Sequence, residues 1–219
     1  MPGSGARFPR GGYQQPVAQP FPGRYFSLQP LHVASDTSAL YAASHEPESR
    51  DAIWRYMTAG PFEDATSMAM WLHGRSRLPD LVPFTVRDAV SGELVGSISL
   101  MSIRPEHGVA ELGFIWYRAS AQRTRANTEA AYHLLHYCFH TLGYRRVEWK
   151  CDAENARSRA AAERLGFSFE GIFRNHMIVK GLNRDTAWFA MLDKDWARIG
   201  GAVRRWLYED DATPLTTAL

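Results

Sequence analysis

The sequence predicts an α+β fold with a central mixed, mostly antiparallel β-sheet flanked by helices. Two segments before residue 82 have the apolar spacing of amphipathic helices. Two β-rich runs then enclose the turn signal AVSG, and a third follows RPEHG. Strand–helix–strand–helix alternation and a hairpin complete the pattern. Helices followed by an antiparallel meander and then by a strand–helix–strand unit are typical of a mixed sheet.

The chain divides into one domain and two terminal segments. Residues 1–24 hold five prolines and five glycines and show no hydrophobic periodicity, so we expect a flexible tail there. Residues 25–208 contain every periodic segment and form the domain. Residues 209–219 are expected to be a short C-terminal tail.

The expected strands are apolar or alternating runs bounded by turn residues. They are 25–31, 82–88, 93–103, 109–117, 145–152, 169–181 and 185–192, with LNRD as the turn of the last hairpin. Residues 109–117 are apolar enough to be covered on both faces.

The expected helices follow the period of 3.6 residues. The first covers 36–46 with Asp36 or Thr37 as its cap, and the second lies within 62–78. A third, after residue 128, ends at Gly143 as a glycine C-cap ends a helix, and a fourth runs from 155 to the Leu-Gly-Phe stop. A C-terminal amphipathic helix carries Trp196, Ile199, Val203 and Trp206.

Composition excludes several classes of protein. Apolar residues make up 45% and charged residues 22% of the 219, which is typical of a globular protein. A net charge of +2 gives no argument for nucleic acid binding. Without an apolar run of 18 residues or a signal-peptide core we expect no membrane segment and a cytoplasmic protein. Cys138 and Cys151 are expected to be buried structural thiols.

The segment AQRTRANT lies between the strand 109–117 and the next helix. A helix that begins after a strand presents free N–H groups and the positive end of its dipole, which together suit an anion. Arg123 and Arg125 add positive charge, and Asn127 or Thr128 can cap the helix or contact the anion. Spacing alone leaves open that these residues are an exposed loop and an ordinary cap.

The second half of the chain resembles the GNAT superfamily of acyl-CoA-dependent N-acyltransferases, in particular the branch that acetylates ribosomal-protein N-termini. The resemblance runs from Tyr25 to Trp196 and is strongest from Val109 to Trp188. Two segments carry it: AQRTRANT, and NARSRAAAERLGF, which is similar to the family's Asn-x-x-Ser helix ending in Leu-Gly-Phe. The resemblance implies the GNAT fold with a strand–loop–helix acyl-CoA site.

The resemblance also implies the residues that hold the acyl donor. The family's pyrophosphate loop reads Gln or Arg, two residues, Gly, one residue, then Gly or Ala; Gln122 fits, whereas Arg125 and Asn127 replace the small residues. The implied contacts are the backbone of Phe114, Ile115 and Trp116 for pantetheine, with Gln122, Arg123, Thr124, Arg125, Ala126, Asn127 and Thr128 for pyrophosphate. The loop can still offer its N–H groups to the phosphate if its residues keep negative φ angles, with the arginines adding to the contacts.

The second motif implies roles near the thioester. Asn155 would contact pantetheine or the substrate, and Ser158 would lie near the sulfur. The family position that often carries a tyrosine as general acid is Ala162 here, so the chain groups with serine-bearing variants. The alternative for Ser158 is a solvated helix serine.

A carboxylate is needed because an ammonium group of ordinary pKa must lose a proton before it attacks a thioester. Glu111, near the start of the strand that holds pantetheine in the family, is the first candidate base. Glu148 on the next strand is the second. Either could instead be a structural carboxylate paired with Lys150 or Arg118.

The sequence therefore predicts an enzyme that transfers an acyl group from acetyl-CoA or another acyl-CoA to a primary amine, small molecule or peptide, in a ternary complex. We expect no metal, because His133, His136 and His140 lack a partner ligand at matching spacing. We expect a monomer or homodimer. The alternative is a non-catalytic acyl-CoA-binding sensor or interaction module with the same fold. The sequence chooses neither the amine nor the acyl chain.

Overall fold

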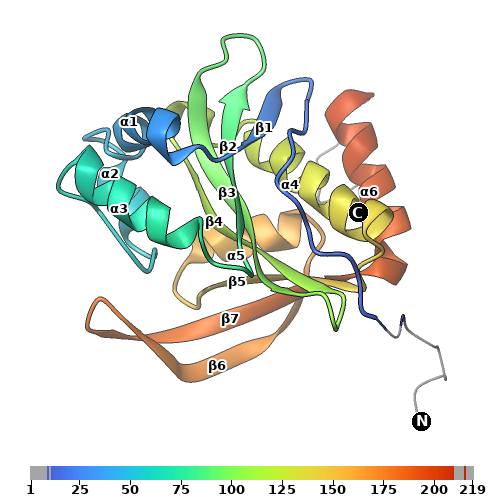
Figure 1. The fold of residues 1–219 in the computed structure, drawn as a ribbon. Coiled ribbons are helices and arrows are strands. Elements are labelled where there is room, and N and C mark those ends of the chain that lie inside the picture. Colours follow the sequence, from blue (N-terminus) through green and yellow to red (C-terminus); the bar gives the residue numbers. More distant parts are fainter. Residues whose placement is uncertain (1–8, 10, 210–214, 216–219) are drawn as a thin grey trace.

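In the computed structural model, which describes residue 9, residues 11–209 and residue 215, the centre is a seven-stranded sheet (Figure 1). The strand order is β1-β2-β3-β4-β5-β7-β6, and only the pair β4–β5 is parallel. The strands are β1 Phe26–Pro30, β2 Val82–Asp88, β3 Leu94–Arg104, β4 Val109–Tyr117, β5 Arg146–Asp152, β6 Ser168–Val179 and β7 Leu182–Leu192. The predicted mixed, mostly antiparallel sheet is confirmed.

Helices cover both faces of this sheet. One group packs on the face that carries Trp116: α1 Val33–Ser44, α2 Arg50–Trp54 and α3 Ala65–Arg75 (Figure 1). The opposite face carries α4 Ala126–His136, continued by a π-helical turn Tyr137–Thr141, with α5 Ala156–Arg164 and α6 Asp193–Tyr208. Within the described residues no helix combines the length and apolar character needed to cross a membrane.

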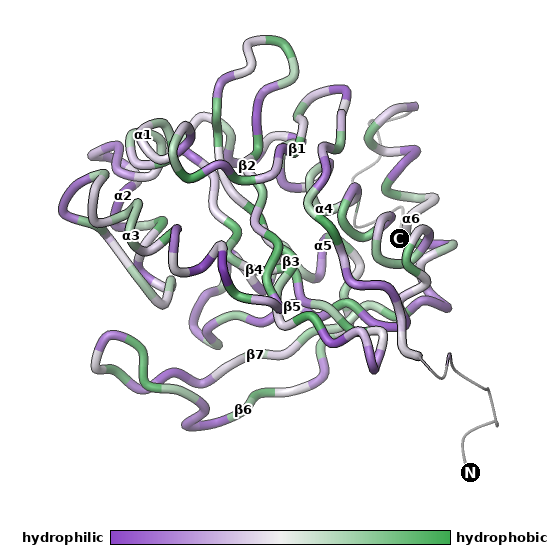
Figure 2. Tube along the Cα trace, in the orientation of Figure 1, coloured by the Kyte–Doolittle hydropathy of each residue, from purple (hydrophilic) through white to green (hydrophobic). Residues whose placement is uncertain are grey.

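Two hydrophobic cores follow from this layering. The larger lies between the sheet and α4–α6, and its fully buried members include Leu112, Leu134 and Phe189. The smaller lies under α1–α3 around Trp54, whose indole N–H donates to the Ser44 carbonyl. Figure 2 shows hydrophobic residues along the central strands, whereas the outer loops mix hydrophilic and hydrophobic residues. Alternation in β3 and β4 supplies side chains to both cores.

Three boundaries differ from the sequence-based expectation. The cap of α1 is His32, because the Asp36 carboxylate accepts from the His32 N–H at 2.9 Å from within the first turn. The short helix α2 was not expected. The β6–β7 turn is Lys180-Gly181 rather than LNRD, and both residues have positive φ, as a two-residue hairpin turn of this type requires.

The N-terminal segment is the main correction to the predicted domain layout. Residues 11–24 lie along α4 and β1 instead of forming an unpacked tail (Figure 1). The Tyr13 N–H donates to the Pro105 carbonyl at 2.9 Å, and the Tyr13 ring packs edge-on against Tyr144. Phe21 pairs with Leu28 in a β-bridge and its ring contacts Tyr137.

The structure describes only some of the other residues in the two predicted tails. Proline and glycine suit an extended strap whose few aromatic residues pack on the domain, which composition alone could not show. Residues 1–8 and 10 lie outside the described residues. Of the predicted tail 209–219, Glu209 follows α6 directly and Leu215 is buried in the larger core; the others lie outside the described part.

Removal of this strap should destabilise the domain. Phe21→Ala should lower the free energy of unfolding by about 2 kcal/mol, or about 4–8 °C in melting temperature, because aromatic packing in the core is lost. Val17, whose side chain is 59% exposed, provides the matched control, and Val17→Ala should melt with the wild type. Calorimetric melting that shows both variants unchanged would mean that the strap contributes nothing to stability.

Candidate functional site

The strands β4 and β5 separate inside the sheet. Their parallel pairing ends at Leu112↔Trp149, although β4 continues to Tyr117 and β5 to Asp152. At the point of separation Phe114 has a φ of 50°, and the β3–β4 register shifts there. A bulky residue at positive φ bends the strand at some energetic cost. The β5-facing backbone groups of residues 113–117 are consequently free of the ladder, and we call this opening the fork.

The loop that follows β4 is held by its own side chains. The Gln122 amide donates to the Tyr117 carbonyl at 2.9 Å, and the Thr124 hydroxyl donates to the Ala121 carbonyl at 2.7 Å. Thr124 Oγ1 also lies 3.2 Å from the Ala126 N–H and so caps the start of α4. Arg123 has a φ of 61°, so the loop does not keep negative φ throughout. Without glycine, an arginine adopts the left-handed conformation that this turn needs.

The two loop arginines differ in their surroundings. Arg123 is exposed beside the helix start. The Arg125 guanidinium lies between two rings, 4.6 Å from the centre of Tyr25 and 5.3 Å from that of Trp206. Arg125 thus packs between a ring that directly precedes β1 and a ring of α6.

The polar side chains in the first turn of α4 have different surroundings, and only some of them can face a ligand. Thr128 is fully buried, and its hydroxyl accepts from Arg164 of α5 at 2.7 Å, so this side chain does not face an anion. Asn127 Oδ1 is buried and has no hydrogen-bond partner among the described residues. Ala126 is fully buried. The N–H groups of this first turn have no acceptors within the helix, which leaves an anion site at the end of the fork.

Ser158 lies at the apex of the fork through a contact that the motif did not reveal. Its hydroxyl oxygen accepts from the indole N–H of Trp149, the last β5 residue paired with β4, at 3.0 Å. The hydroxyl proton can still be donated. The neighbouring Cys151 thiol has a raised pKa because it is buried, which does not suit a nucleophile. Cys138 is likewise buried, as expected for a structural thiol.

Asn155 caps α5. Its side-chain oxygen accepts from the Ser158 N–H at 3.1 Å, so the two motif residues are joined to each other. The amide nitrogen of Asn155 has no such role in the cap.

Both candidate bases belong to one buried ion-pair network. Glu111 and Glu148 face each other in the β4–β5 register, and the ammonium group of Lys150 lies 2.9 Å from an oxygen of each. Glu148 also binds Arg104 at 3.0 Å and Arg146 at 2.9 Å. The proposed pairing with Lys150 is present, whereas Arg118 instead binds Glu46 and Glu93.

The two carboxylates differ in the number of cations that bind them. Burial would raise the pKa of Glu148, but the hydrogen bonds from Lys150 and Arg146 and the charge of Arg104 outweigh it and lower the pKa. Glu111 uses one oxygen, Oε2, for both Lys150 and the Ser102 hydroxyl. Its Oε1 lies toward Gly113, where an added Cβ would be 3.6 Å away. Glu111 is thus the less neutralised of the two.

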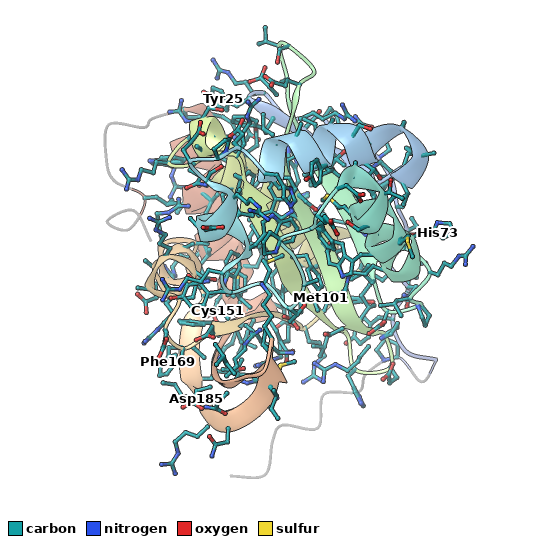
Figure 3. The ribbon with its side chains drawn as sticks, turned by 90° about the vertical axis from the view of Figure 1, so that its left-hand side faces the viewer. Tyr25, His73, Met101, Cys151, Phe169 and Asp185 are labelled. Atoms are coloured by element: carbon teal, nitrogen blue, oxygen red, sulfur yellow. The ribbon has the colours of Figure 1, made fainter. Side chains whose placement is uncertain are left out.

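An aromatic wall borders the fork on the α3 side. The rings of Phe114 and Trp71 lie 5.8 Å apart edge-on, and Trp116 packs against Trp54. Arg75, at the end of α3, places its guanidinium 3.6 Å above the Phe114 ring. Figure 3 shows Met101 and Cys151 on the strands between the helices and the β6–β7 hairpin.

Four side chains of this site could not be predicted from the sequence: Trp149, Arg164, Arg75, and Lys150 as a partner of both carboxylates. An alternating strand pattern places Trp149 and Lys150 on opposite faces, but Ser158, the partner of Trp149, and Glu111, one of the two partners of Lys150, come from other elements. No signal in the sequence links Arg164 to Thr128 or Arg75 to Phe114. Among the described residues no cluster of three metal-ligating side chains occurs.

Comparisons with known proteins agree with this architecture. Residues 26–168 match the Acetyltransferase (GNAT) domain. A GCN5-related N-acetyltransferase from Brucella melitensis is 39% identical, with a TM-score of 0.89 over 94% of this chain and 96% of that chain. The relative "Putative ribosomal N-acetyltransferase YdaF" of Bacillus subtilis is 32% identical over 48% of this chain and 57% of its own length.

A solved structure of Mycobacterium smegmatis RimJ in complex with CoA-disulfide gives a TM-score of 0.69 at 21% identity, over 83% of this chain and 87% of that chain; at that identity the likeness shows the fold alone. The fold, together with the open β4–β5 edge of the fork, is that of the acyltransferase class. The chain belongs to the GNAT acetyltransferase family and is similar to its ribosomal-protein acetyltransferase-like branch. The matched part spans 57% of the YdaF relative.

The two roles suggested for Asn155 can be separated by two substitutions. Asn155→Ala should destabilise the protein by about 1 kcal/mol because the cap of α5 is lost. Asn155→Asp keeps an accepting oxygen, so it should melt with the wild type and lose only contacts made by the amide nitrogen. If Asn155→Asp has wild-type kinetics in a steady-state acetyltransfer assay, Asn155 acts as a cap and contacts no substrate.

Proposed function

We propose that the protein transfers an acyl group, acetyl as the first choice, from acyl-CoA to a primary amine by direct attack in a ternary complex. The observation that supports this most is the fork: a strand edge with free backbone groups leads to the open N-terminus of α4. A thioester donor with a pantetheine arm and a pyrophosphate needs both features in this order.

The side chains fit such a donor. Pantetheine amides can pair with the backbone of Phe114, Ile115 and Trp116, where the ladder to β5 has ended. The amides of α4 would bind pyrophosphate, with the exposed Arg123 beside them. This site is shaped by Gln122, Thr124, Ala126 and Thr128. Arg125 stabilises the loop without facing the ligand.

The same residues can assist the chemistry. Glu111 would take a proton from the acceptor ammonium, directly or through water, so that the free amine attacks the thioester carbonyl. Collapse of the tetrahedral intermediate breaks the carbon–sulfur bond and releases CoA thiolate, and the proton still held by the nitrogen passes to water or to the departing sulfur. The Ser158 hydroxyl, oriented by Trp149, would donate a hydrogen bond to that sulfur. No covalent enzyme intermediate is needed, since neither cysteine has a flanking base.

The test is release of free CoA from acetyl-CoA with a panel of amines, followed by mass spectrometry of the amine. The panel should contain peptides with free N-termini, because YdaF carries a ribosomal N-acetyltransferase name, together with spermidine and amino acids. Amine-dependent release with a gain of one acetyl group supports the proposal. Tight binding of acetyl-CoA without turnover of any amine would instead support the non-catalytic sensor.

A further inference from the structure

The ammonium group of Lys150 has three close neighbours. It lies 2.9 Å from Glu111 Oε2 and 2.9 Å from Glu148 Oε2. The third neighbour is the ring of Trp188, whose centre lies 4.0 Å away and whose residue pairs with Lys150 across the β5–β7 register. The Phe173 ring of β6 lies 4.6 Å from that of Trp188 and supports it. Three contacts match the three N–H donors of an ammonium group, so Lys150 is held in one place.

The two carboxylates depend on Lys150 to different degrees. Glu148 also binds Arg104 and Arg146, so it retains two cations if the charge of Lys150 is removed. Among the described residues Lys150 is the one cation that forms an ion pair with Glu111. Without that charge Glu111 would face Glu148, its partner in the β4–β5 register, with no cation between them. The charge of Lys150 therefore matters most for Glu111.

Lys150 also determines which oxygen of Glu111 remains available. The ammonium group and the Ser102 hydroxyl both donate to Oε2. In the part of the chain that the structure describes, Oε1 receives no hydrogen bond, and it lies toward Gly113, the first β4 residue beyond the last pair with β5. The carboxylate is thus fixed through one oxygen and can take a proton on the other.

We propose that Lys150 is a positioning residue for acyl transfer, which keeps Glu111 ionised toward acid pH and holds its Oε2, so that Oε1 takes the proton of the acceptor. This inference rests on the proposed acyl transfer with Glu111 as base. A cation at this distance lowers the pH at which a carboxylate takes up a proton, whereas a second carboxylate nearby raises it. A base that is already protonated cannot take the proton that the acceptor must lose.

Other charged or titratable groups around this pair come from three strands: Arg104 of β3, Arg146 and Glu148 of β5, and Glu170 and His176 of β6. The arginines are paired with carboxylates, since both bind Glu148 and Arg146 also binds Glu170 at 2.6 Å. The ring of His176 lies 6.1 Å from that of Trp188. Histidine is the side chain that ordinarily changes charge near neutral pH, so His176 requires a control of its own.

The experiment records kcat against pH with saturating acetyl-CoA and the best acceptor of the amine panel. Lys150→Gln removes the charge but keeps a hydrogen-bond donor, whereas Lys150→Arg keeps the charge. Trp188→Leu removes the ring and leaves every charge in place, and Trp188→Phe restores a ring. Lys194, exposed on α6, supplies the matched control Lys194→Gln, and His176→Gln tests the nearby histidine.

We expect the acid limb of the kcat profile to move to higher pH by about 1–2 units in Lys150→Gln. At alkaline pH, where Glu111 is ionised in both proteins, kcat should return to within about 3-fold of the wild type. Lys150→Arg, Trp188→Phe, Lys194→Gln and His176→Gln should keep the wild-type limb. Trp188→Leu should shift the limb in the same direction by less, because Lys150 is then held by the carboxylates alone.

Two measurements keep the result interpretable. Calorimetry should show acetyl-CoA affinity within about 2-fold of the wild type for every variant, since Lys150 acts on the base and not on the donor. If loss of the buried charge prevents Lys150→Gln from folding, the comparison of Trp188→Leu with Trp188→Phe decides in its place, because both retain the whole charge network.

Three results would overturn the inference. A Lys150→Gln enzyme that melts earlier but keeps the wild-type acid limb would show that Lys150 only neutralises buried carboxylates. Equal shifts in Lys150→Gln and Lys150→Arg would show that the charge is not the cause, and a limb that moves in His176→Gln would belong to that histidine. Wild-type turnover of Glu111→Gln at every pH would instead contradict the base in the proposed function, and is thereby distinguished from all three.

Discussion

Glu129→Ala is expected to lower the free energy of unfolding by about 3–4 kcal/mol, or about 10 °C in melting temperature. The Glu129 carboxylate is fully buried in α4, and it accepts from the backbone N–H groups of Arg24, Tyr25 and Phe26 at 2.7–2.9 Å. The hydroxyl of Tyr208 in α6 donates to it at 2.9 Å. Removal of the carboxylate leaves four donors, three backbone N–H groups and the Tyr208 hydroxyl, without this acceptor.

The packing around Glu129 makes this loss difficult to repair. A Cβ on Gly23 would lie 2.8 Å from the Glu129 carboxyl carbon, so the chain passes too close for a side chain to replace the contact. Burial and the hydrogen bond to Glu129 raise the pKa of Tyr208, which keeps its hydroxyl a donor.

Controls make this prediction specific. Glu129→Gln keeps one accepting oxygen and should fall between the wild type and Glu129→Ala. Glu163 lies exposed on α5, so Glu163→Ala should change the free energy of unfolding by no more than about 0.5 kcal/mol. Chemical denaturation provides the values, and a Glu129→Ala protein as stable as Glu163→Ala would show that the three backbone bonds contribute nothing.

Glu111→Gln is expected to lower kcat for amine acetylation by about 10²- to 10³-fold while acetyl-CoA affinity stays within about 2-fold. The glutamine keeps the volume and an oxygen for Lys150 but cannot take a proton. The loss should be greatest at low pH, where most of the acceptor amine is protonated. At high pH the amine reacts without a base, and the variant should approach the wild type.

The second carboxylate supplies the comparison. Glu148→Gln removes the partner of Arg104, Arg146 and Lys150, so we expect mainly a loss of stability, with a pH–rate profile of wild-type shape. A Glu148→Gln protein that folds and loses turnover at low pH, alongside an active Glu111→Gln, would show that the base lies on β5. Ser102→Ala, which removes the hydrogen bond to Glu111 Oε2, should have a smaller effect than Glu111→Gln.

The sheet and most helices could be predicted because local signals mark them. Alternation in 93–103, the Leu-Gly-Phe stop after α5 and the glycine at 143 each depend on nearby residues. The strand–loop–helix site was also predictable, since a helix start after a strand creates an anion site whichever loop residues precede it. Ser158 and Asn155 were marked by a motif three residues apart.

The remaining features depend on contacts between distant segments. The strap 11–24 contacts Tyr137 and Tyr144, more than a hundred residues away, and no local period reports such contacts. The Phe114 ring beside Arg75 and the Tyr25 ring beside Arg125 likewise come from distant segments. Nothing in the sequence marks Glu129, because three of its four donors are backbone N–H groups, which have no signature in a sequence.

The most direct test of the fork is hydrogen–deuterium exchange with and without acetyl-CoA, at a concentration that calorimetry shows to saturate the protein. Binding should slow exchange at the amides of residues 114–117 and 126–128, while those of the edge strand β6 remain unchanged as an internal control. Saturated protein that shows no protection in either segment, with protection elsewhere in the chain, would contradict the claim that the acyl donor binds between β4 and β5.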